Sequence, residues 1–257
     1  TGALDRPIAF PENDRPGVMS LAGGAALLSR YSVLVGRRLA VVANHSLADG
    51  TVDLLERAGA TISRIDPQAG VMQAYSGKRA TGLKQGGRAR LYDAVLPSGG
   101  FTPVVHLWRH AGGKLDWCET RQAFLPGRGP DNMRAIGAAN GTYDLEPALE
   151  EASAAGAGHT IKRRETSYHA TALWPKPGGT GRQWIDFQHD VTLKDVEVAA
   201  RENYVSVEHL KRYTTLGMAS DQGKTSNMAG LAAMATIQGK PIPEVGTTTF
   251  RPPFVPV

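Results

Sequence analysis

The sequence contains little of what cross-links or anchors a protein. Only one of its 257 residues is a cysteine, Cys118, which excludes an internal disulfide and any zinc or iron–sulfur site built on several cysteines. No apolar run approaches the roughly 18 to 20 residues that a membrane-spanning helix needs. No basic start followed by an apolar stretch indicates a secretory signal. We therefore predict a cytoplasmic protein that does not interact with membranes.

Aromatic residues are also scarce, at 7% of the chain, and the formal net charge of +5 arises from small basic groups scattered along it. A nucleic-acid-binding surface needs basic residues on one face together with stacking aromatics, so nucleic acid is not an expected partner. The hydrophobic share of 41% is high enough to bury a core. This composition excludes a disordered or fibrous chain.

The clearest local unit in the first half is a strand, a helix and a second strand. The apolar run Arg38–Ala43 predicts a buried strand, residues 46–58 a helix capped by Ser46, and Thr61–Ile65 the second strand. This βαβ order implies a parallel sheet. The turn at residues 44–50 has no glycine before the helix has begun, although a dinucleotide-binding turn needs glycines so that the backbone can approach the pyrophosphate. The unit therefore has the Rossmann shape without its phosphate-binding chemistry.

Further elements of the first half are predicted from apolar patterns and turn residues. We expect a helix near 19–31, short strands between 70 and 97, a helix within 102–110, a strand at 122–126, a short strand at 134–136 that breaks into a Gly/Ala turn, and a helix at 145–155. The turns between 70 and 97 are expected at Gly77, Gly82 and Gly86-Gly87.

The composition then changes, because residues 156–182 are polar and rich in Gly, Pro and Lys, which is typical of a linker. Three helices are expected after it. The first begins with a capping box formed by Thr192 and Asp195, the second is capped by Ser206, and the third covers residues 226–238.

These patterns predict an α/β fold with a βαβ unit, followed by a small all-α subdomain. The expected divisions are a partial Rossmann-like α/β domain at 1–155, which the resemblance described below implies to be FAD/NAD-binding, the linker at 156–182, the helical subdomain at 183–240 and an extended tail at 241–257.

Several motifs that suggest a particular chemistry are incomplete. The run Gly223-Lys224-Thr225-Ser226 resembles the end of a P-loop, but the spacing to the previous glycine is wrong and a helix precedes it instead of a strand. His106 and His110 are four residues apart, as two metal ligands on a helix would be, yet no third ligand is near. No Gly-x-Ser-x-Gly elbow supports a hydrolase. We therefore expect no metal site.

A more complete chemical set lies between residues 211 and 226, where cations, hydroxyls and the start of a helix come together. This combination suits a phosphate group or the edge of a flavin. The candidate residues are Lys211, Arg212, Thr214, Thr215, Lys224 and Thr225. The alternative is an ordinary basic surface loop.

Three long stretches also resemble one protein family. They are Thr1-Gly2-Ala3 with Asn13-Asp14-Arg15-Pro16-Gly17, Trp184-Ile185-Asp186-Phe187-Gln188-His189-Asp190 with the block that continues to Asn227, and Gly246-Thr247-Thr248-Thr249-Phe250-Arg251-Pro252-Pro253. Together they closely resemble the α subunit of heterotetrameric sarcosine oxidases. The resemblance implies a piece of that subunit: the second half of a dinucleotide-binding domain, then a helical subdomain like the iron–sulfur module of related opine and proline dehydrogenases, but without its cysteines.

The resemblance also implies cofactors. In such folds a late Gly-Ala-Ala turn returns to the dinucleotide, which assigns NAD contacts to Gly137, Ala138, Ala139, Asn140, Gly141, Tyr143 and Leu145. A complete NAD site would also need an upstream glycine fingerprint. FMN would lie between the α and β subunits, with the 211–225 set as its α-side wall. FAD and tetrahydrofolate would bind elsewhere in the complex.

The implied activity is the oxidative demethylation of sarcosine to glycine by O2, with H2O2 formed and the one-carbon unit passed to tetrahydrofolate, in a complex with β, γ and δ subunits. Because the substrate-oxidising flavin would belong to β, we expect no catalytic residue here and no activity from this chain alone. Two alternatives stay open. One is a subunit of another oxidase or dehydrogenase acting on a secondary amine, an N-methyl amino acid or an opine; the other is a non-catalytic assembly module.

Overall fold

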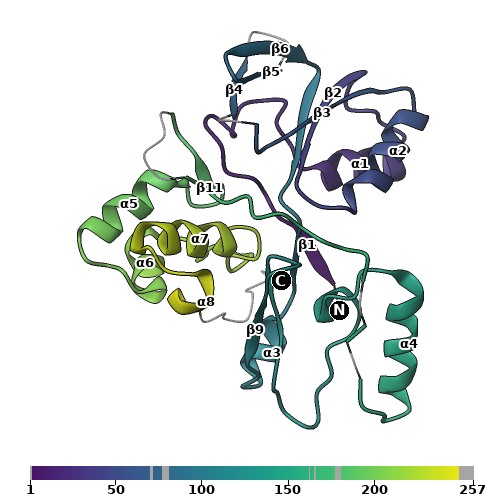
Figure 1. Ribbon diagram of the computed structural model, residues 1–257. Coiled ribbons are helices and arrows are strands. Elements are labelled where there is room, and N and C mark those ends of the chain that lie inside the picture. Colours follow the sequence, from purple (N-terminus) through teal and green to yellow (C-terminus); the bar gives the residue numbers. More distant parts are fainter. Residues whose placement is uncertain are drawn as a thin grey trace.

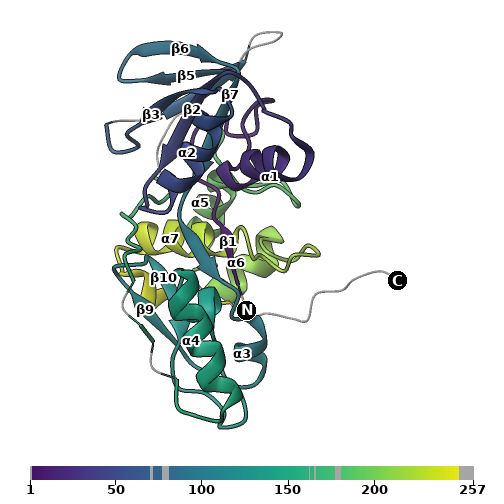
Figure 2. The same ribbon diagram turned by 90° about the vertical axis from the view of Figure 1, so that its right-hand side faces the viewer.

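The computed structural model describes residues 2–69, 72–76, 81–161, 163–164, 166–176 and 181–248. The chain forms three parts arranged around a central two-stranded ladder (Figure 1). An α/β part with two sheets lies at the top, a bundle of helices at one side, and a smaller α/β part at the bottom. Turned by 90°, the three parts follow one another along the long axis, with the helical part in the middle (Figure 2).

The upper part is built on a parallel sheet in the order β3-β2-β7, formed by Arg38–Ala43 (β2), Thr61–Ile65 (β3) and Ala94–Ser98 (β7). Helix α2 (Ala48–Arg57) returns the chain from β2 to β3, and α1 (Leu21–Tyr31) lies beside it. The central strand β2 is covered on both faces, which explains its uninterrupted apolar sequence. The predicted βαβ unit is confirmed.

A second, antiparallel sheet in the order β4-β5-β6 lies above it (Figure 2). Its strands are Met72–Ser76 (β4), Thr81–Gln85 (β5) and Arg88–Tyr92 (β6). Inward side chains of the two sheets share one core, in which Val42 and Val95 contact Leu83 and its neighbours.

One of the expected turns in this region was wrong. Gly82 lies inside β5, opposite Tyr75 on β4, where a Cβ atom would collide with the tyrosine ring. The glycine is therefore explained by close packing within a strand, as strand glycines often are. Gly86 and Gly87 do form the turn between β5 and β6, and Gly77 lies outside the described residues.

The central ladder pairs β1 (Ala3–Asp5) with β8 (Phe101–Pro103) in antiparallel register. The lower part follows it. Its elements are α3 (His106–His110), the hairpin of β9 (Leu115–Cys118) and β10 (Ala123–Pro126), the 3₁₀ helix η1 (Gly137–Asn140) and α4 (Leu145–Gly156).

The strand expected at residues 134–136 was wrong. Ile136 keeps an extended backbone, with φ −138° and ψ 158°, but no described strand pairs with it. The Arg134 guanidinium instead folds back onto the carbonyl of Met133 at 2.9 Å. An apolar pattern predicts an extended segment, but pairing depends on a neighbour that the pattern does not name.

Part of the stretch expected as a linker is held against the rest of the molecule, whereas residues 156–160 are exposed. Tyr168 is fully buried, and Ala170 forms an antiparallel bridge with His45 in the upper part. These two residues therefore anchor the segment 166–176, although its side chains between and beside them are largely exposed.

The helical part combines two short strands with four helices. They are β11 (Trp184–Asp186), β12 (Val191–Thr192), α5 (Leu193–Arg201), α6 (Val207–Thr214), α7 (Asn227–Gln238) and α8 (Ile242–Val245). The predicted capping box of Thr192 and Asp195 is present at α5, and Ser206 caps α6 through the His209 N–H.

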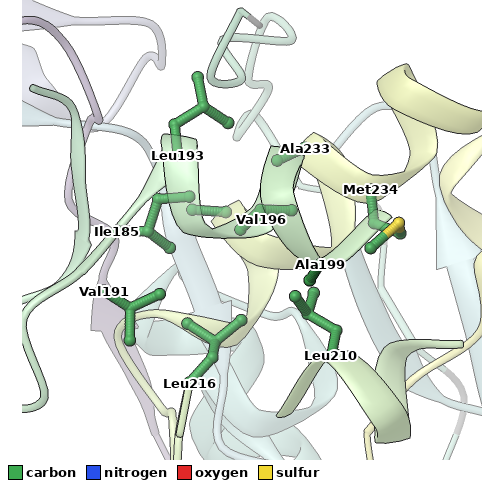
Figure 3. Close-up of a cluster of buried hydrophobic side chains, with 10 residues drawn as sticks. Ile185, Val191, Leu193, Val196, Ala199, Leu210, Leu216, Ala233 and Met234 are labelled. Carbon is green, nitrogen blue, oxygen red and sulfur yellow. The ribbon is translucent and has the colours of Figure 1, made fainter. Parts of the chain in front are cut away.

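Figure 3 shows the core of this part. Val196 and Ala199 on α5 point toward Leu210 on α6 and Met234 on α7, and all four are buried. Helix α7 is apolar around most of its circumference, with its residues from Asn227 to Ala235 buried. Such a helix is stable only when other elements surround it, so α5, α6 and α8 together explain its composition.

The extended tail expected at 241–257 was wrong for residues 242–245, which form α8. Pro241 is the extended residue before this helix, and a proline lies in its first turn, where the missing N–H has no intrahelical partner to lose. Residues 249–257 lie outside the described part. Among the described residues, no helix has both the length and the apolar character needed to span a membrane.

Candidate functional site

The predicted NAD contacts lie on one turn of the lower part. Gly137–Asn140 forms η1, and Gly141 ends it with φ 80°. Gly137 itself has φ 60°, so both flanking positions favour glycine. Tyr143 then turns toward the centre of the molecule, whereas Leu145 begins α4 and is 75% exposed. The predicted residues up to Tyr143 thus form one compact turn, and Leu145 lies on the outer surface.

A buried carboxylate on α4 holds this turn. Glu151 is only 3% exposed. Its oxygens accept hydrogen bonds from the Gly137 N–H at 2.8 Å, the Asn140 side-chain amide at 3.2 Å and the Thr142 hydroxyl at 2.6 Å. Hydrogen bonds to a charged acceptor are stronger than neutral ones, so the carboxylate fixes both ends of the turn. Sequence reasoning missed Glu151.

Two arginines bind the carbonyl groups of the same turn. Arg163 donates to the Asn140 carbonyl at 2.8 Å, and Arg121 donates to the Gly141 carbonyl at 3.0 Å. Burial, with the nearby Arg121 as a smaller cause, lowers the pKa of Arg163. Side chains of this chain therefore fix the conformation of the turn. Such hydrogen bonds preorganise a binding site before its ligand arrives.

Tyr143 connects the turn to an aromatic cluster. Its ring centroid is 4.4 Å from that of Tyr168 and 5.8 Å from that of Phe101. His45 packs against the same two rings, at 5.9 Å and 5.4 Å. Burial, and secondly Tyr168, raises the pKa of Tyr143, so its phenol is protonated at neutral pH. The four rings come from four distant segments, which local sequence patterns cannot join.

A buried guanidinium lies beside the cluster. Arg6 is 3% exposed and donates to the Gly99 carbonyl at 2.7 and 3.0 Å and to the Gln122 carbonyl at 2.9 Å. Its charge also lies 4.4 Å from the centre of the Trp174 ring, a cation–π arrangement. Burial lowers the pKa of Arg6 to about 10, so the guanidinium stays charged at neutral pH. Its contacts connect the upper part, the lower part and residues 166–176.

A series of hydrogen bonds connects Asp5 of β1, Ser98 of β7 and His45, which follows β2. The Ser98 hydroxyl donates to the Asp5 carboxylate at 2.5 Å and lies 2.7 Å from His45 Nε2. Burial raises the pKa of Asp5 and lowers that of His45 to about 4. A hydrolytic triad places the histidine between the serine and the acid. Here the serine is in the middle, so this chain of contacts is structural.

The turn between β2 and α2 is where a dinucleotide fold would hold the pyrophosphate. Residues 167–171 of the same chain bind one side of it, and an open pocket lined by Asn44, Asp49 and Asp66 lies beside it. The Ser46 N–H donates to the His169 carbonyl at 3.1 Å, and the Ser46 hydroxyl accepts from the His169 N–H at 3.2 Å. With this hydroxyl engaged, Leu47 rather than the expected Ser46 occupies the cap position of α2. The turn therefore lacks the glycines of a phosphate-binding turn and is bound on one side by residues 167–171.

The second predicted set does not converge on one point. Lys211 is buried, whereas its neighbour Arg212 is exposed and pairs with Glu208 at 3.1 Å. Successive residues on a helix point to different sides, so the two cations cannot bind one ligand from α6. The Thr214 hydroxyl donates to the Leu210 carbonyl at 2.8 Å.

The two remaining threonines of that set also use their hydroxyls for hydrogen bonds within the chain. The Thr215 hydroxyl donates to the Thr214 carbonyl at 2.6 Å, and the Thr225 hydroxyl to the Asp221 carboxylate at 2.9 Å. Lys224 lines an internal cavity of about 30 Å³ between the helical and lower parts. This is the volume of about one water molecule, so a phosphate or a flavin ring could meet this segment only from outside.

A buried acid organises the loops around this segment. Asp186 is 2% exposed and accepts hydrogen bonds from the Gly217 N–H at 2.8 Å, the Ser226 hydroxyl at 3.2 Å and the Gln188 N–H at 2.9 Å. It therefore joins β11 to the start of α7. Within the described residues, no group of three or more His, Cys, Asp or Glu side chains is arranged to hold a metal ion.

Residues 180–257 match the family model of the sarcosine oxidase A3 domain. Over its whole length the chain is 36% identical to sarcosine oxidase subunit alpha of Rhizobium meliloti (strain 1021) and 31% identical to that of Corynebacterium sp. (strain P-1). It covers 30% and 32% of those two proteins, so it spans about a third of their length.

Among solved structures, the chain resembles L-proline dehydrogenase from P. horikoshii with a TM-score of 0.79 at 23% sequence identity. The likeness covers all of this chain and 56% of that one. It confirms the expected fold class, a partial Rossmann-like α/β arrangement followed by a helical part. The predicted resemblance is likewise confirmed: the chain is similar over its whole length to a segment of sarcosine oxidase α subunits.

Proposed function

We propose that this chain is part of the α subunit of a sarcosine oxidase-type oxidoreductase and that its turn at Gly137–Tyr143 contributes one wall of an NAD site. The observation that carries the proposal is a turn with two left-handed glycines, fixed by Glu151, in a chain similar throughout to sarcosine oxidase α subunits. Gly137 is half-buried and has no Cβ, so a ligand can approach the backbone there, whereas Gly141 is buried against Leu125. If NAD binds there, residues of this chain would hold and orient the dinucleotide.

The residues present fit such a ligand by their chemistry. The turn has a small, half-buried side chain at Ala138, so a large planar or phosphorylated group can approach its backbone there, whereas Ala139 is buried. Tyr143 adds an aromatic face with a protonated phenol. The β2–α2 unit is not the proposed site, since residues 167–171 bind its turn.

In the complete enzyme we propose that sarcosine is demethylated to glycine, with O2 reduced to H2O2 and the one-carbon unit passed to tetrahydrofolate. The β, γ and δ subunits and FAD would belong to other parts of that assembly, in the cytoplasm. An FMN shared with β would meet this chain on its outer face, where Arg212 and Thr215 are exposed. No step of the oxidation requires a catalytic residue from this chain.

One observation favours a different function for the upper part of the molecule. The turn after β2 has no glycine before its helix begins and is bound by residues 167–171, so the upper part would serve as an assembly module within the same subunit. A related subunit acting on another N-methyl amino acid, a secondary amine or an opine would have the same architecture, and assays with several amines separate these substrates.

The test is NAD binding by the full-length protein, measured by calorimetry and by mass spectrometry of the nucleotide released on denaturation. Ala138→Glu places a carboxylate on the turn and is expected to weaken NAD binding at least tenfold, because it repels the pyrophosphate. Ala157→Glu makes the same change at an exposed position beyond α4 and is expected to leave affinity within twofold. A wild-type protein that neither contains nor binds NAD would refute the proposed site.

A further inference from the structure

We infer that Glu151 is a positioning residue for dinucleotide binding, an inference that rests on the proposed function of the turn. Helix α4 carries three glutamates, and they differ sharply in environment. Glu146 and Glu150 are exposed, and Glu150 pairs with Arg164 at 2.7 Å in solvent. Glu151 is buried and points to the turn. Burying a carboxylate is costly unless its oxygens are fully hydrogen-bonded, so this placement needs a specific partner.

That partner is the turn itself. All three donors to Glu151 come from the six residues Gly137–Thr142. One donor is the backbone N–H of Gly137 at the start of η1, and another is the hydroxyl of Thr142 just past its end. The carboxylate therefore spans η1 from end to end and opposes any change in its two left-handed glycines.

The same hydrogen bonds determine which backbone groups of the turn are still available to contact a ligand. The Gly137 N–H is bound by Glu151, and the carbonyls of Asn140 and Gly141 are bound by Arg163 and Arg121. A ligand would therefore meet the turn at Ala138, which is half-buried, because Ala139 is only 4% exposed. Because the turn is ordered before binding, less conformational entropy is lost when the dinucleotide arrives, and affinity rises accordingly.

The substitution that isolates this role is Glu151→Gln. The glutamine has nearly the same volume, so the packing of α4 against the turn is kept. One of its terminal atoms becomes an NH2 group, and if its oxygen faces Asn140 and Thr142, that NH2 faces the Gly137 N–H. Two donors then oppose each other, and the start of η1 loses its anchor.

A second pair of variants tests the other end of the turn without touching the carboxylate. Thr142 is 1% exposed, and its hydroxyl donates to Glu151. Thr142→Val removes this donor at constant shape, whereas Thr142→Ser retains it. A positioning role predicts that NAD affinity falls in Thr142→Val and returns in Thr142→Ser, which loss of packing alone would not produce.

The experiment measures the NAD dissociation constant and the thermal midpoint of the full-length protein for each variant. Glu151→Gln and Thr142→Val are expected to weaken NAD binding about tenfold. Glu150→Gln, the matched change at the neighbouring exposed position, is expected to stay within twofold of wild type. The thermal midpoint without NAD shows whether each variant is folded, and the Thr142 pair decides the question if Glu151→Gln does not fold.

The outcomes separate this inference from the proposed function. If wild type and Glu150→Gln bind NAD and the Glu151 and Thr142→Val variants bind it equally well, Glu151 is only structural and the inference is overturned. If Thr142→Ser binds as weakly as Thr142→Val, the inference is also overturned. If wild type itself does not bind NAD, the proposed function fails first.

Discussion

Several ionisable side chains are buried or half-buried where the parts of this molecule meet. Arg6, Asp5 and His45 lie at the junction of the central ladder with the parallel sheet, and His106 lies under the helical part. Each position was absent from the predicted site. Their contacts are long-range: the Arg6 guanidinium binds carbonyls 93 and 116 residues away.

Two histidines, the half-buried His45 and the buried His106, predict loss of stability in mild acid. Burial lowers the pKa of both His45 and His106 to about 4, whereas an unfolded histidine takes up its proton near pH 6.5. Their contribution is therefore complete above about pH 6.5 and is lost as the pH falls toward 4. At pH 5 each would lower the free energy of unfolding by about 2 kcal/mol relative to pH 7.5. The raised pKa of Asp5 works in the opposite direction, since protonation of that buried carboxyl relieves its desolvation.

Urea unfolding of wild type, His45→Asn and His106→Asn at several pH values between 4.5 and 7.5 measures this effect. Each variant is expected to have a flatter pH profile than wild type. The same change at His159, which is exposed, is expected to leave the profile unchanged. Equal slopes for wild type and for the His45 and His106 variants would contradict the assignment.

At the scale of elements, two buried acids fix loops rather than catalyse reactions. Glu151 holds η1 against α4, and Asp186 holds β11 against the start of α7. The helices themselves follow local signals. The helix predicted over residues 226–238 is α7, Asn227–Gln238, which ends at Gly239, because apolar periodicity and a terminating glycine lie within a few residues of each other.

Asp186→Asn is expected to destabilise the helical part by about 2–3 kcal/mol, because its amide NH2 faces one of the N–H groups that the carboxylate now accepts. Hydrogen exchange of α7 amides and urea unfolding measure the loss. Asp190→Asn is the matched control, since Asp190 is exposed and has φ 54°, a conformation that asparagine tolerates. Comparable stability of the two variants would contradict the role given to Asp186.

At the scale of the whole molecule, a small apolar cluster joins the helical part to the lower α/β part. It contains Phe124 of β10, Val207 of α6, and Met228 and Leu231 of α7. Phe124 also meets the Trp117 ring edge-on at 5.1 Å. Side-chain packing therefore connects the parts on either side of the expected domain boundary near residue 156, in addition to the covalent chain.

Phe124→Ala is expected to cost about 3–5 kcal/mol, as large-to-small changes of a buried phenylalanine do, and to separate the unfolding of the helical part from that of the rest. Calorimetry would show one transition in wild type and two in the variant. Leu107→Ala is the control, because Leu107 is 72% exposed. One transition at the wild-type midpoint in Phe124→Ala would show that the cluster does not couple the parts.

The sequence by itself determined the local elements of this protein and the family it resembles. The βαβ unit, the capping box at Thr192 and the extent of α7 depend on apolar periodicity and capping residues close together in the chain. The long motifs that carry the resemblance are likewise contiguous. The sequence also indicated, from the missing glycines alone, that the turn after β2 has no phosphate-binding chemistry.

Only the tertiary structure decided which side chains meet. It placed Lys211 inside and Arg212 outside, laid residues 167–171 on the turn after β2, and directed Glu151 rather than Glu150 at the turn of the proposed NAD site. The physical reason is that burial and hydrogen bonding of a polar group depend on all the elements packed around it. Those elements are tens of residues apart in the chain, so no local pattern records their contact.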